Sequence, residues 1–430
     1  MSAADPLRES CESAARAAAA SRSALALLTG GERTALLHDI AASIRRDQPR
    51  ILEANAVDLA AGAALSPPLS PALRDRLTLT AARVESMAAA VDSIARQGDP
   101  IGKVVDGRVL ANGARLEKRR VPIGVILMIY ESRPNVTSDA AALCLKSGNA
   151  VILRGGKEAA HTNRAVANAV RAPLVARGIP DAVSLIETAD RRAIDILVTL
   201  RGLIDLVIPR GGPALIKAVS DSATIPVIKH DAGNCHIYID EHLDALEDAA
   251  VRITVNAKAQ RPGVCNAAET LLIHAAAADR MLPRLAEALI KAGVELRCCE
   301  RSRAILRAFP AERVRAATEA DWDTEYLDLI LAVKVVDSLD AAAAHILRHG
   351  SKHTEAIVTS SIAASQRFIA LIDSASVMVN CSTRFADGGE YGLGAEIGIS
   401  TDKLHARGPM GAEDLTTFQW ILTANGQVRA

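Results

Sequence analysis

Apolar residues recur at helical spacing along the chain up to about residue 97. Two sets each share one face of a helix. They are Leu36, Leu37, Ile40 and Ile44, and Leu77, Val84, Met87, Val91 and Ile94. Segment 66–71 lies between them and contains three prolines, so it cannot be helical throughout. The pattern therefore predicts a largely helical N-terminal region interrupted by one loop.

From residue 121 onward, short apolar runs alternate with amphipathic stretches. The strand-like runs are 125–129, 150–153, 183–186 and 204–208. A helix carrying Val166, Val170 and Leu174 on one face lies between the second and third runs, with Gly178 as its C-cap. This alternation predicts a parallel, doubly wound sheet that binds ligands at the carboxyl ends of its strands.

The rest of the chain continues the α/β pattern. Residues 225–239 read as a strand, a glycine turn and another strand, and residues 276–375 as further α/β units. The tail beyond Val379 is rich in glycine and has no regular period, which is typical of a functional loop. Asn112-Gly113 between two short strand-like runs predicts a hairpin, which needs a pairing partner in its own chain or in another subunit.

Composition narrows the class of protein. The chain has 430 residues, half of them hydrophobic, which suits two or three domains. A net charge of zero and 2% aromatic residues argue against a nucleic-acid-binding surface. Seven scattered cysteines suit a reducing compartment, and the longest apolar run, 121–130, is too short to span a membrane. We therefore expect a soluble cytoplasmic protein.

Cys265 is the first candidate for a catalytic group. It follows Pro262 and Gly263 on a loop between a predicted helix, 243–255, and a predicted strand, 269–273. Lys258 and Arg261 make the loop electropositive, which favours the thiolate that a nucleophile requires. The alternative is a half-buried cysteine that packs as a small hydrophobe. Cys235 is a rival nucleophile, but it opens a predicted strand.

Two glycine pairs mark candidate phosphate sites. Gly155-Gly156 and Gly211-Gly212 each follow a predicted strand and precede a helix, where backbone amides and the helix N-terminus favour an anion. Such pairs are common, so neither is specific alone. His345, His349 and His353 recur every fourth residue, but Gly350 interrupts the helix and no further ligand completes a set, so we expect no metal site.

Six longer strings point to a family. They are residues 120–125, 130–137, 260–266, 380–385, 394–401 and 404–411. In this order, and across nearly the whole chain, they resemble the gamma-glutamyl phosphate reductases, a branch of the aldehyde dehydrogenase superfamily. The resemblance implies an aldehyde-dehydrogenase-like α/β fold with a Rossmann-like cofactor domain, an α/β catalytic domain, and an oligomerisation region made of a β-hairpin and the C-terminal tail.

The resemblance also implies domain boundaries. The cofactor domain would comprise residues 1–106 and 121–230, with a return segment near 360–380. The catalytic domain would span residues 231–359, and the oligomerisation region residues 107–120 and 381–430.

The implied reaction is the NADPH-dependent reduction of L-glutamyl 5-phosphate to L-glutamate 5-semialdehyde and phosphate through a cysteinyl thioester. It is the second step of L-proline biosynthesis from glutamate. The implied cofactor is NADP(H), and the implied partners are further copies of the chain and a separate glutamate kinase. The alternative is a coenzyme-A-acylating aldehyde dehydrogenase. Aldehyde oxidation to an acid is disfavoured, because residues 230–233 lack the Glu that activates water in ordinary aldehyde dehydrogenases.

Site roles follow residue by residue from the resemblance. Cys265 matches the nucleophile and Asn135 the asparagine that stabilises the oxyanion. Lys157 matches the lysine that contacts a ribose, and Glu325 the glutamate that contacts the nicotinamide ribose. Arg154, Gly211 and Gly212 are further cofactor candidates, which come from the glycine-pair turns and their flanking cations and not from the resemblance. The anionic substrate needs cations, for which the candidates are Arg133, Lys258, Arg261, Arg384 and Arg407. The alternative for each is a structural or surface role.

Overall fold

The computed structural model describes residues 5–229 and 232–429, which divide into two compact units. Unit 1 comprises the described residues up to Lys229, with Gly392–Gly398 and the residues from Leu404 onward. Unit 2 comprises the described residues from 232 to Tyr391, with Ile399–Lys403. Both units are α/β and contain parallel sheets, which confirms the predicted fold class.

Unit 1 is built on a parallel sheet of four strands in the order β5-β4-β3-β6. The strands are β3 (Val125–Tyr130), β4 (Ala150–Gly155), β5 (Val183–Leu185) and β6 (Leu206–Arg210). Every residue of β3 is buried, as expected of a continuous apolar run in the middle of a parallel sheet. The carboxyl ends of β3, β4 and β6 therefore lie along one edge of this sheet.

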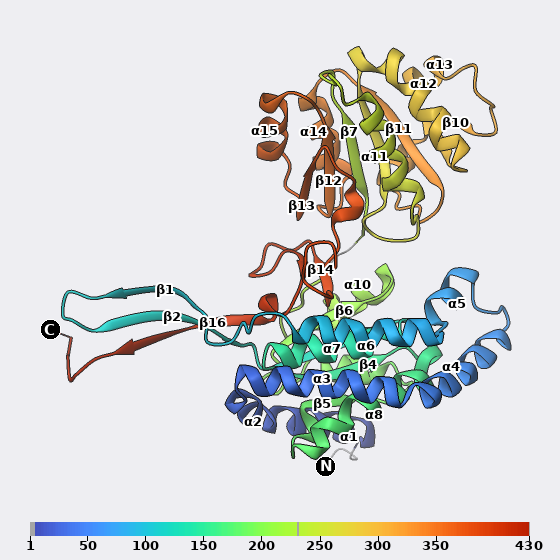
Figure 1. Ribbon diagram of the computed structural model, residues 1–430. Coiled ribbons are helices and arrows are strands. Elements are labelled where there is room, and N and C mark those ends of the chain that lie inside the picture. The colour runs from blue at the N-terminus through green and yellow to red at the C-terminus, as the bar shows by residue number, and fades with distance from the viewer. Residues whose placement is uncertain (1–4, 230–231, 430) are drawn as a thin grey trace. The chain divides into compact units, whose positions relative to one another are not determined.

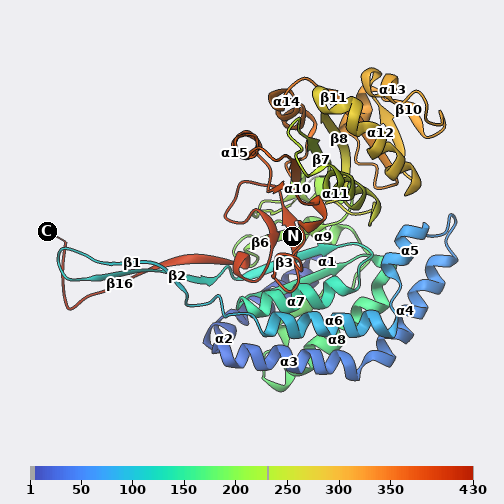
Figure 2. The same ribbon diagram turned by 45° about the horizontal axis from the view of Figure 1, so that its top comes forward.

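Helices cover this sheet, and most match the predicted helical pattern. They are α1 (Pro6–Ala20), α2 (Arg22–Leu27), α3 (Gly30–Arg46), α4 (Gln48–Ala63), α5 (Pro71–Leu77), α6 (Ala81–Ala95), α7 (Asn135–Lys146), α8 (Ala160–Ala176), α9 (Arg192–Leu197) and α10 (Pro213–Ser222). α3 begins with a capping box formed by Thr29 and Glu32 and packs along both α6 and α8 (Figure 2). Short 3-10 turns lie at Lys157–Ala159, Pro180–Ala182 and Glu413–Leu415.

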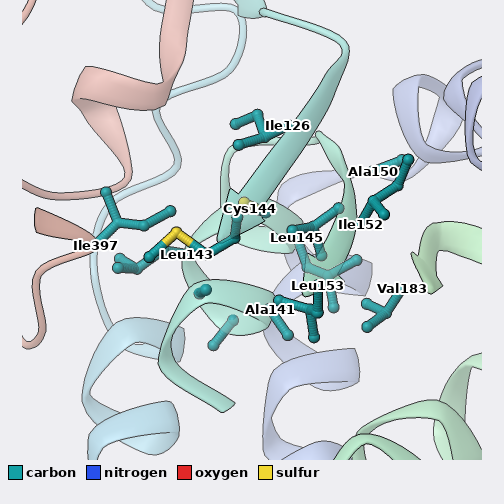
Figure 3. Packing of buried hydrophobic residues seen from close by; sticks show 14 of the residues in the cluster. Ile126, Ala141, Leu143, Cys144, Leu145, Ala150, Ile152, Leu153, Val183 and Ile397 are labelled. Carbon is teal, nitrogen blue, oxygen red and sulfur yellow. The ribbon is translucent and has the colours of Figure 1, made fainter. Parts of the chain in front are cut away.

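The core of unit 1 is formed by the sheet together with buried residues of α1, α3, α6, α7 and α8. Figure 3 shows Ile126, Ile152 and Leu153 from the strands packing with Leu143 and Cys144 from the helix, all of them buried. With few aromatic residues in the chain, this core is filled by aliphatic side chains, whose burial provides the main favourable free energy of folding.

A three-stranded antiparallel ribbon forms part of unit 1. It consists of β1 (Val104–Val109), β2 (Arg115–Pro122) and β16 (Thr416–Thr423), with β2 in the middle. The predicted hairpin is confirmed, because β1 and β2 pair and Gly113 has a φ of +85°, which favours glycine. Its pairing partner is β16 of the same chain, and Figure 1 shows the ribbon extending away from the helices of unit 1.

Unit 2 contains a parallel sheet of seven strands in the order β10-β9-β11-β8-β7-β12-β13. The strands are β7 (Cys235–Ile239), β8 (Ala268–His274), β9 (Glu295–Cys298), β10 (Val314–Ala316), β11 (Ile330–Val336), β12 (Thr354–Val358) and β13 (Ser376–Val379). The helices are α11 (Glu247–Ala259), α12 (Ala275–Lys291), α13 (Glu300–Ile305), α14 (Leu339–His349) and α15 (Ile362–Leu371), with 3-10 turns at Glu319–Asp323 and Thr383–Phe385. Short strands β14 (Gly398–Ser400) and β15 (Gly408–Met410) complete the elements.

Two hydrophobic cores cover the two faces of the unit 2 sheet. Ile237 packs with residues of α11 and α12, whereas its neighbour Tyr238 packs with Ile346 of α14 and Phe368 of α15. Consecutive residues of β7 thus contribute to different cores, because side chains alternate across a strand.

Three predicted details differ in the structure. Residues 225–228 form no regular strand, and only Val227 makes a bridge, to Val207. The segment near 360–380, expected to return to the first domain, lies in unit 2, because β13 pairs with β12. Residues 381–391, expected in the oligomerisation region, also belong to unit 2.

Candidate active site

Cys265 lies where the sequence predicts, on the loop between α11 and β8 in unit 2. The residue is partly exposed and forms no disulfide. The segment that leads into β7 packs against its backbone, and a Cβ added to Gly233 would lie 2.0 Å from the Cys265 carbonyl oxygen. Glycine is therefore required at position 233, and the loop that carries Cys265 is held against β7 by backbone contact.

Cys235, the rival nucleophile, is a sealed core residue. Its thiol lies 3.2 Å from the Cys265 carbonyl oxygen and 3.7 Å from Nδ1 of His353. Burial raises the pKa of the Cys235 thiol well above its usual value, so the reactive thiolate is strongly disfavoured. The partly exposed Cys265 is the better candidate of the two.

Glu325 follows the 3-10 turn at Glu319–Asp323 and lies beside the same loop. Its carboxylate accepts a hydrogen bond of 2.9 Å from the Gly233 amide, and burial raises its pKa. Glu325, Gly233 and Cys265 are therefore neighbours in unit 2. The cofactor role implied for Glu325 stays a prediction.

Lys258 is not available as a substrate-binding cation in this structure. Its ammonium forms a 2.5 Å ion pair with Glu269, and both side chains are fully buried. Burial raises the pKa of Glu269 to about 7, and the other Glu269 oxygen accepts a hydrogen bond from the Leu327 amide. Lys258 lies in the last turn of α11 and Glu269 near the start of β8, so the pair joins the two elements that flank the Cys265 loop.

Arg384 provides the cation that the loop needs. Its guanidinium donates to Oε1 of Gln260 at 2.8 Å and also to the side chain of Asn266, two residues of the Cys265 loop. Burial lowers the pKa of Arg384, the charge of Arg261 lowers it further, and the charges of Asp387 and Cys265 oppose this shift. Unit 2 therefore brings Cys265, Arg384 and the exposed Arg261 together.

The remaining predicted residues lie in unit 1, several at the turn between β3 and α7. Ser132 has a φ of +39°, an unusual value for a residue other than glycine. Its amide and its hydroxyl both donate to Oε1 of Glu158 at 2.7 Å, which holds the turn. Arg133 is partly exposed on this turn, and Asn135 is exposed at the first position of α7.

The Asn135 amide is fixed by a residue that the sequence analysis missed. Its Nδ2 donates to Oδ2 of Asp139 at 2.9 Å, one helical turn further along α7. Burial raises the pKa of Asp139 to about 6, although hydrogen bonds and the charge of Arg210 oppose this shift. The signal was present in the sequence, since an aspartate four residues after an asparagine shares its helix face.

The predicted cofactor residues lie at the carboxyl ends of β4 and β6. Lys157 is exposed after β4, and Gly212 precedes α10 after β6. The Gly212 amide donates to Oε2 of Glu131 at 2.8 Å, and a Cβ on Gly211 would lie 2.6 Å from the same oxygen. The anion position at the start of α10 is therefore occupied by a carboxylate of the chain itself.

Arg154 has a structural role in this arrangement. It is buried and donates to the backbone carbonyls of Gly155 and Ala189. Its guanidinium therefore braces the end of β4, rather than presenting a charge to a ligand.

His345 and His349, two members of the histidine series, lie on α14 and pack against each other. The ring of His345 lies 4.6 Å from that of His349 and 5.4 Å from that of Trp322, and burial lowers the His345 pKa to about 2. Among the described residues, no group of three His, Cys, Asp or Glu side chains is placed to hold a metal ion. Within residues 5–229 and 232–429, none of the helices could span a membrane.

Comparisons with known proteins define the class. The family model described as "Aldehyde dehydrogenase family" matches residues 2–298, more than half of the chain. The protein is therefore an oxidoreductase of the aldehyde dehydrogenase type, as predicted.

Closer relatives narrow the class. A gamma-glutamyl phosphate reductase of Moorella thermoacetica is 52% identical over 96% of this chain and 97% of the relative. One from Sulfurovum sp. is 50% identical over 96% of this chain and 98% of the relative. The crystal structure of the Thermotoga maritima enzyme of the same name has a TM-score of 0.93 at 43% identity, covering 98% of this chain and 100% of that one. The chain belongs to the gamma-glutamyl phosphate reductases of the aldehyde dehydrogenase family.

Proposed function

We propose that the protein catalyses the nicotinamide-dependent reduction of L-glutamyl 5-phosphate to L-glutamate 5-semialdehyde and phosphate, a step of L-proline biosynthesis. The names of relatives at about 50% identity support the reaction. The observation that carries the assignment of the nucleophile is the surroundings of Cys265, a partly exposed thiol whose loop is bound by Arg384.

The first chemical step uses the cation beside the thiol. The Cys265 thiolate attacks the acyl carbon, the carbon–oxygen bond to phosphate breaks, and inorganic phosphate leaves with the electron pair. Arg384 and Arg261 stabilise the charge on the departing phosphate, because guanidinium groups match its oxygens. The Asn135 amide is assigned to the oxyanion, where one donor is worth about 3–4 kcal/mol.

The second step must exclude water. A reduced nicotinamide, if held by the cofactor residues, would supply hydride. The thioester carbon accepts the hydride, the carbon–sulfur bond then breaks, and the aldehyde leaves as Cys265 regains its thiolate. Gly233 places no side chain beside Cys265 that could activate water. His230 and Asp231, which complete the stretch without the usual Glu, lie outside the described residues.

The chain offers residues that fit a nicotinamide dinucleotide. Gly211 and Gly212 let backbone approach closely at the start of α10, and Lys157 is exposed on the same edge of the sheet. We propose that Lys157 contacts a ribose and Glu325 the nicotinamide ribose. We also propose NADP(H) rather than NAD(H), with Lys157 as the cation available to an extra phosphate.

The assembly and the setting are also proposals. The β1-β2-β16 ribbon exposes Trp420, Leu422 and Phe418 in unit 1, which suits pairing between copies of the chain. A separate glutamate kinase would supply the labile acyl phosphate in the cytoplasm.

The experiment that tests the function runs the reaction backwards. Purified protein is given pyrroline-5-carboxylate and NADP, and reduction of NADP is followed with and without inorganic phosphate. Activity should require phosphate and should be lost in Cys265→Ala, whereas Cys299→Ala, a partly exposed cysteine of the same unit, should retain it. Activity without phosphate would contradict the reaction, and a requirement for coenzyme A would favour an acylating dehydrogenase.

A further inference from the structure

Asn135 is exposed at the start of α7, where an asparagine side chain has little to fix it. The terminal torsion angle of an asparagine side chain has a broad, roughly two-fold distribution. The amide can therefore present either its oxygen or its nitrogen in a given direction. In this structure Nδ2 donates to Oδ2 of Asp139 at 2.9 Å. A carboxylate only accepts hydrogen bonds, so this contact fixes which end of the amide is the nitrogen.

Ser138 completes the arrangement. Its hydroxyl donates to the backbone carbonyl oxygen of Asn135 at 2.9 Å and lies 3.5 Å from Oδ1 of Asp139. The two carboxylate oxygens therefore have different neighbours, Asn135 on one side and Ser138 on the other. Asp139 is held in place while one N–H of the Asn135 amide remains available for another acceptor.

We propose that Asp139 is a positioning residue, which orients the Asn135 amide so that its second N–H faces the oxyanion formed during thioester chemistry. This inference rests on the proposed function, because it takes the oxyanion role of Asn135 as given. A reversed amide would present an oxygen to the oxyanion and repel it.

The charges around Asp139 make the effect depend on pH. The pKa of Asp139 is raised to about 6 by burial, while hydrogen bonds from Asn135 and Ser138 and the charge of Arg210 on β6 hold it down. Arg210 itself lies 3.7 Å from Glu396. Asp139 is ionised at neutral pH and gains a proton in mild acid. The protonated carboxyl can then donate to the amide oxygen, which allows the reversed orientation.

Direct binding of the substrate ammonium by Asp139 is the competing explanation, and a double-mutant cycle separates the two. The reverse assay gives kcat and KM for pyrroline-5-carboxylate in wild type, Asp139→Ala, Asn135→Ala and the double variant. We expect Asn135→Ala to lower kcat about 10²- to 10³-fold, as for loss of an oxyanion donor. We expect Asp139→Ala to lower kcat about 10- to 100-fold through misplacement of that donor, without raising KM.

The double variant decides the question. If Asp139 acts through Asn135, adding Asp139→Ala to Asn135→Ala costs no further activity. An additive loss, or a rise in KM for Asp139→Ala in both backgrounds, would overturn the proposal. Asp221→Ala is the matched control, because Asp221 accepts from Lys217 four residues earlier on α10 and is well exposed. This control should leave kcat unchanged.

A pH profile gives a second, independent readout and covers the case in which Asp139→Ala fails to fold. The kcat of the wild type should fall as pH drops through about 6, and Asp139→Asn, which keeps an acceptor oxygen but cannot titrate, should lose this acid limb. Retention of the limb in Asp139→Asn would overturn the proposal. Activity surviving in Cys265→Ala would instead refute the proposed function, so the two failures are distinguishable.

Discussion

Cys265 and Cys235 are in contact in unit 2, but their surroundings give their thiols different reactivities. Cys265 is partly exposed beside Arg384, whereas Cys235 is buried, and burial raises its thiol pKa. Iodoacetamide reacts with the thiolate, so we expect it to label Cys265 in the folded protein at neutral pH and to leave Cys235 unmodified. Mass spectrometry of proteolytic peptides after short exposure measures both rates. In urea the two rates should converge, and equal labelling in the folded protein would contradict this account.

Glu131 offers a second test at the scale of one residue. Its carboxylate accepts a hydrogen bond from the Gly212 amide at the start of α10. We propose that a dinucleotide phosphate binds at this amide. Glu131→Gln keeps an acceptor but removes the negative charge that competes with the phosphate. We therefore expect NADP to bind about 2- to 5-fold more tightly, in line with the worth of a charge at a helix N-terminus.

Isothermal titration calorimetry measures this affinity at low and at moderate salt. The gain should shrink as salt rises, because screening weakens interactions between exposed charges. Glu187→Gln is the control, since Glu187 is exposed and pairs with Arg164 in the same unit. Weaker binding by Glu131→Gln would show that the carboxylate assists the dinucleotide instead.

Sequence patterns identified candidate residues better than they predicted the contacts of each residue. Cys265 was preferred to Cys235 because Cys235 opens a strand, and the burial of Cys235 supports that preference. Lys258 was expected to face the substrate because it is close to Cys265 in sequence. Its pairing with Glu269 depends on how α11 packs against β8, which local spacing does not reveal. The Asp139 contact, in contrast, follows from helical spacing, because residues four apart share a helix face.

At the scale of elements, the Lys258–Glu269 pair links the end of α11 to the start of β8. Both groups are fully buried, so removing one leaves the other in the interior without its partner. We expect Lys258→Met to lower the free energy of unfolding by about 3–5 kcal/mol, measured by urea denaturation. Lys258→Met with Glu269→Met should recover most of this loss, because replacing a buried pair by apolar residues is often neutral.

The double variant also tests whether the buried pair holds the Cys265 loop in place. If the pair also holds the Cys265 loop, the double variant should fold but react more slowly with iodoacetamide at Cys265. A surface pair provides the control, and Lys217→Met, which breaks the exposed contact with Asp221, should change stability far less than Lys258→Met does. If Lys258→Met and Lys217→Met lowered the free energy of unfolding by similar amounts, burial of the Lys258–Glu269 pair would not be what makes it important.

Elements with a clear local pattern of hydrophobic or turn residues were predicted correctly. Elements whose pairing or domain depends on tertiary contacts were not. Continuous apolar runs gave β3 and β4, and Asn112-Gly113 gave the hairpin. Residues 225–228 are apolar enough for a strand but lie where Pro226 interrupts regular pairing, so that only one bridge forms. The domain to which β13 belongs is decided by its pairing with β12, a choice that no local pattern encodes.

For the whole molecule, the ribbon of unit 1 is the feature that points beyond a single chain. Along β16, Phe418, Trp420 and Leu422 occupy alternate positions, so they share one face, and all are exposed. The Lys118 ammonium lies 4.3 Å from the Phe418 ring centre, and Arg108 lies 5.9 Å from that of Trp420. Exposed aromatic and arginine side chains of this kind are enriched at interfaces between proteins.

We therefore expect Trp420→Asp with Leu422→Asp to lower the oligomeric state measured by light scattering, because a buried unpaired carboxylate is costly at an interface. The helices and the parallel sheets should keep their circular dichroism, since the substituted side chains are exposed in the single chain. Gln419→Asp, on the other face of β16, provides the control for added charge. If the double variant keeps the molar mass of the wild-type oligomer while that of Gln419→Asp falls, the opposite face of β16 forms the contact between copies. If neither changes, the ribbon does not join copies of the chain.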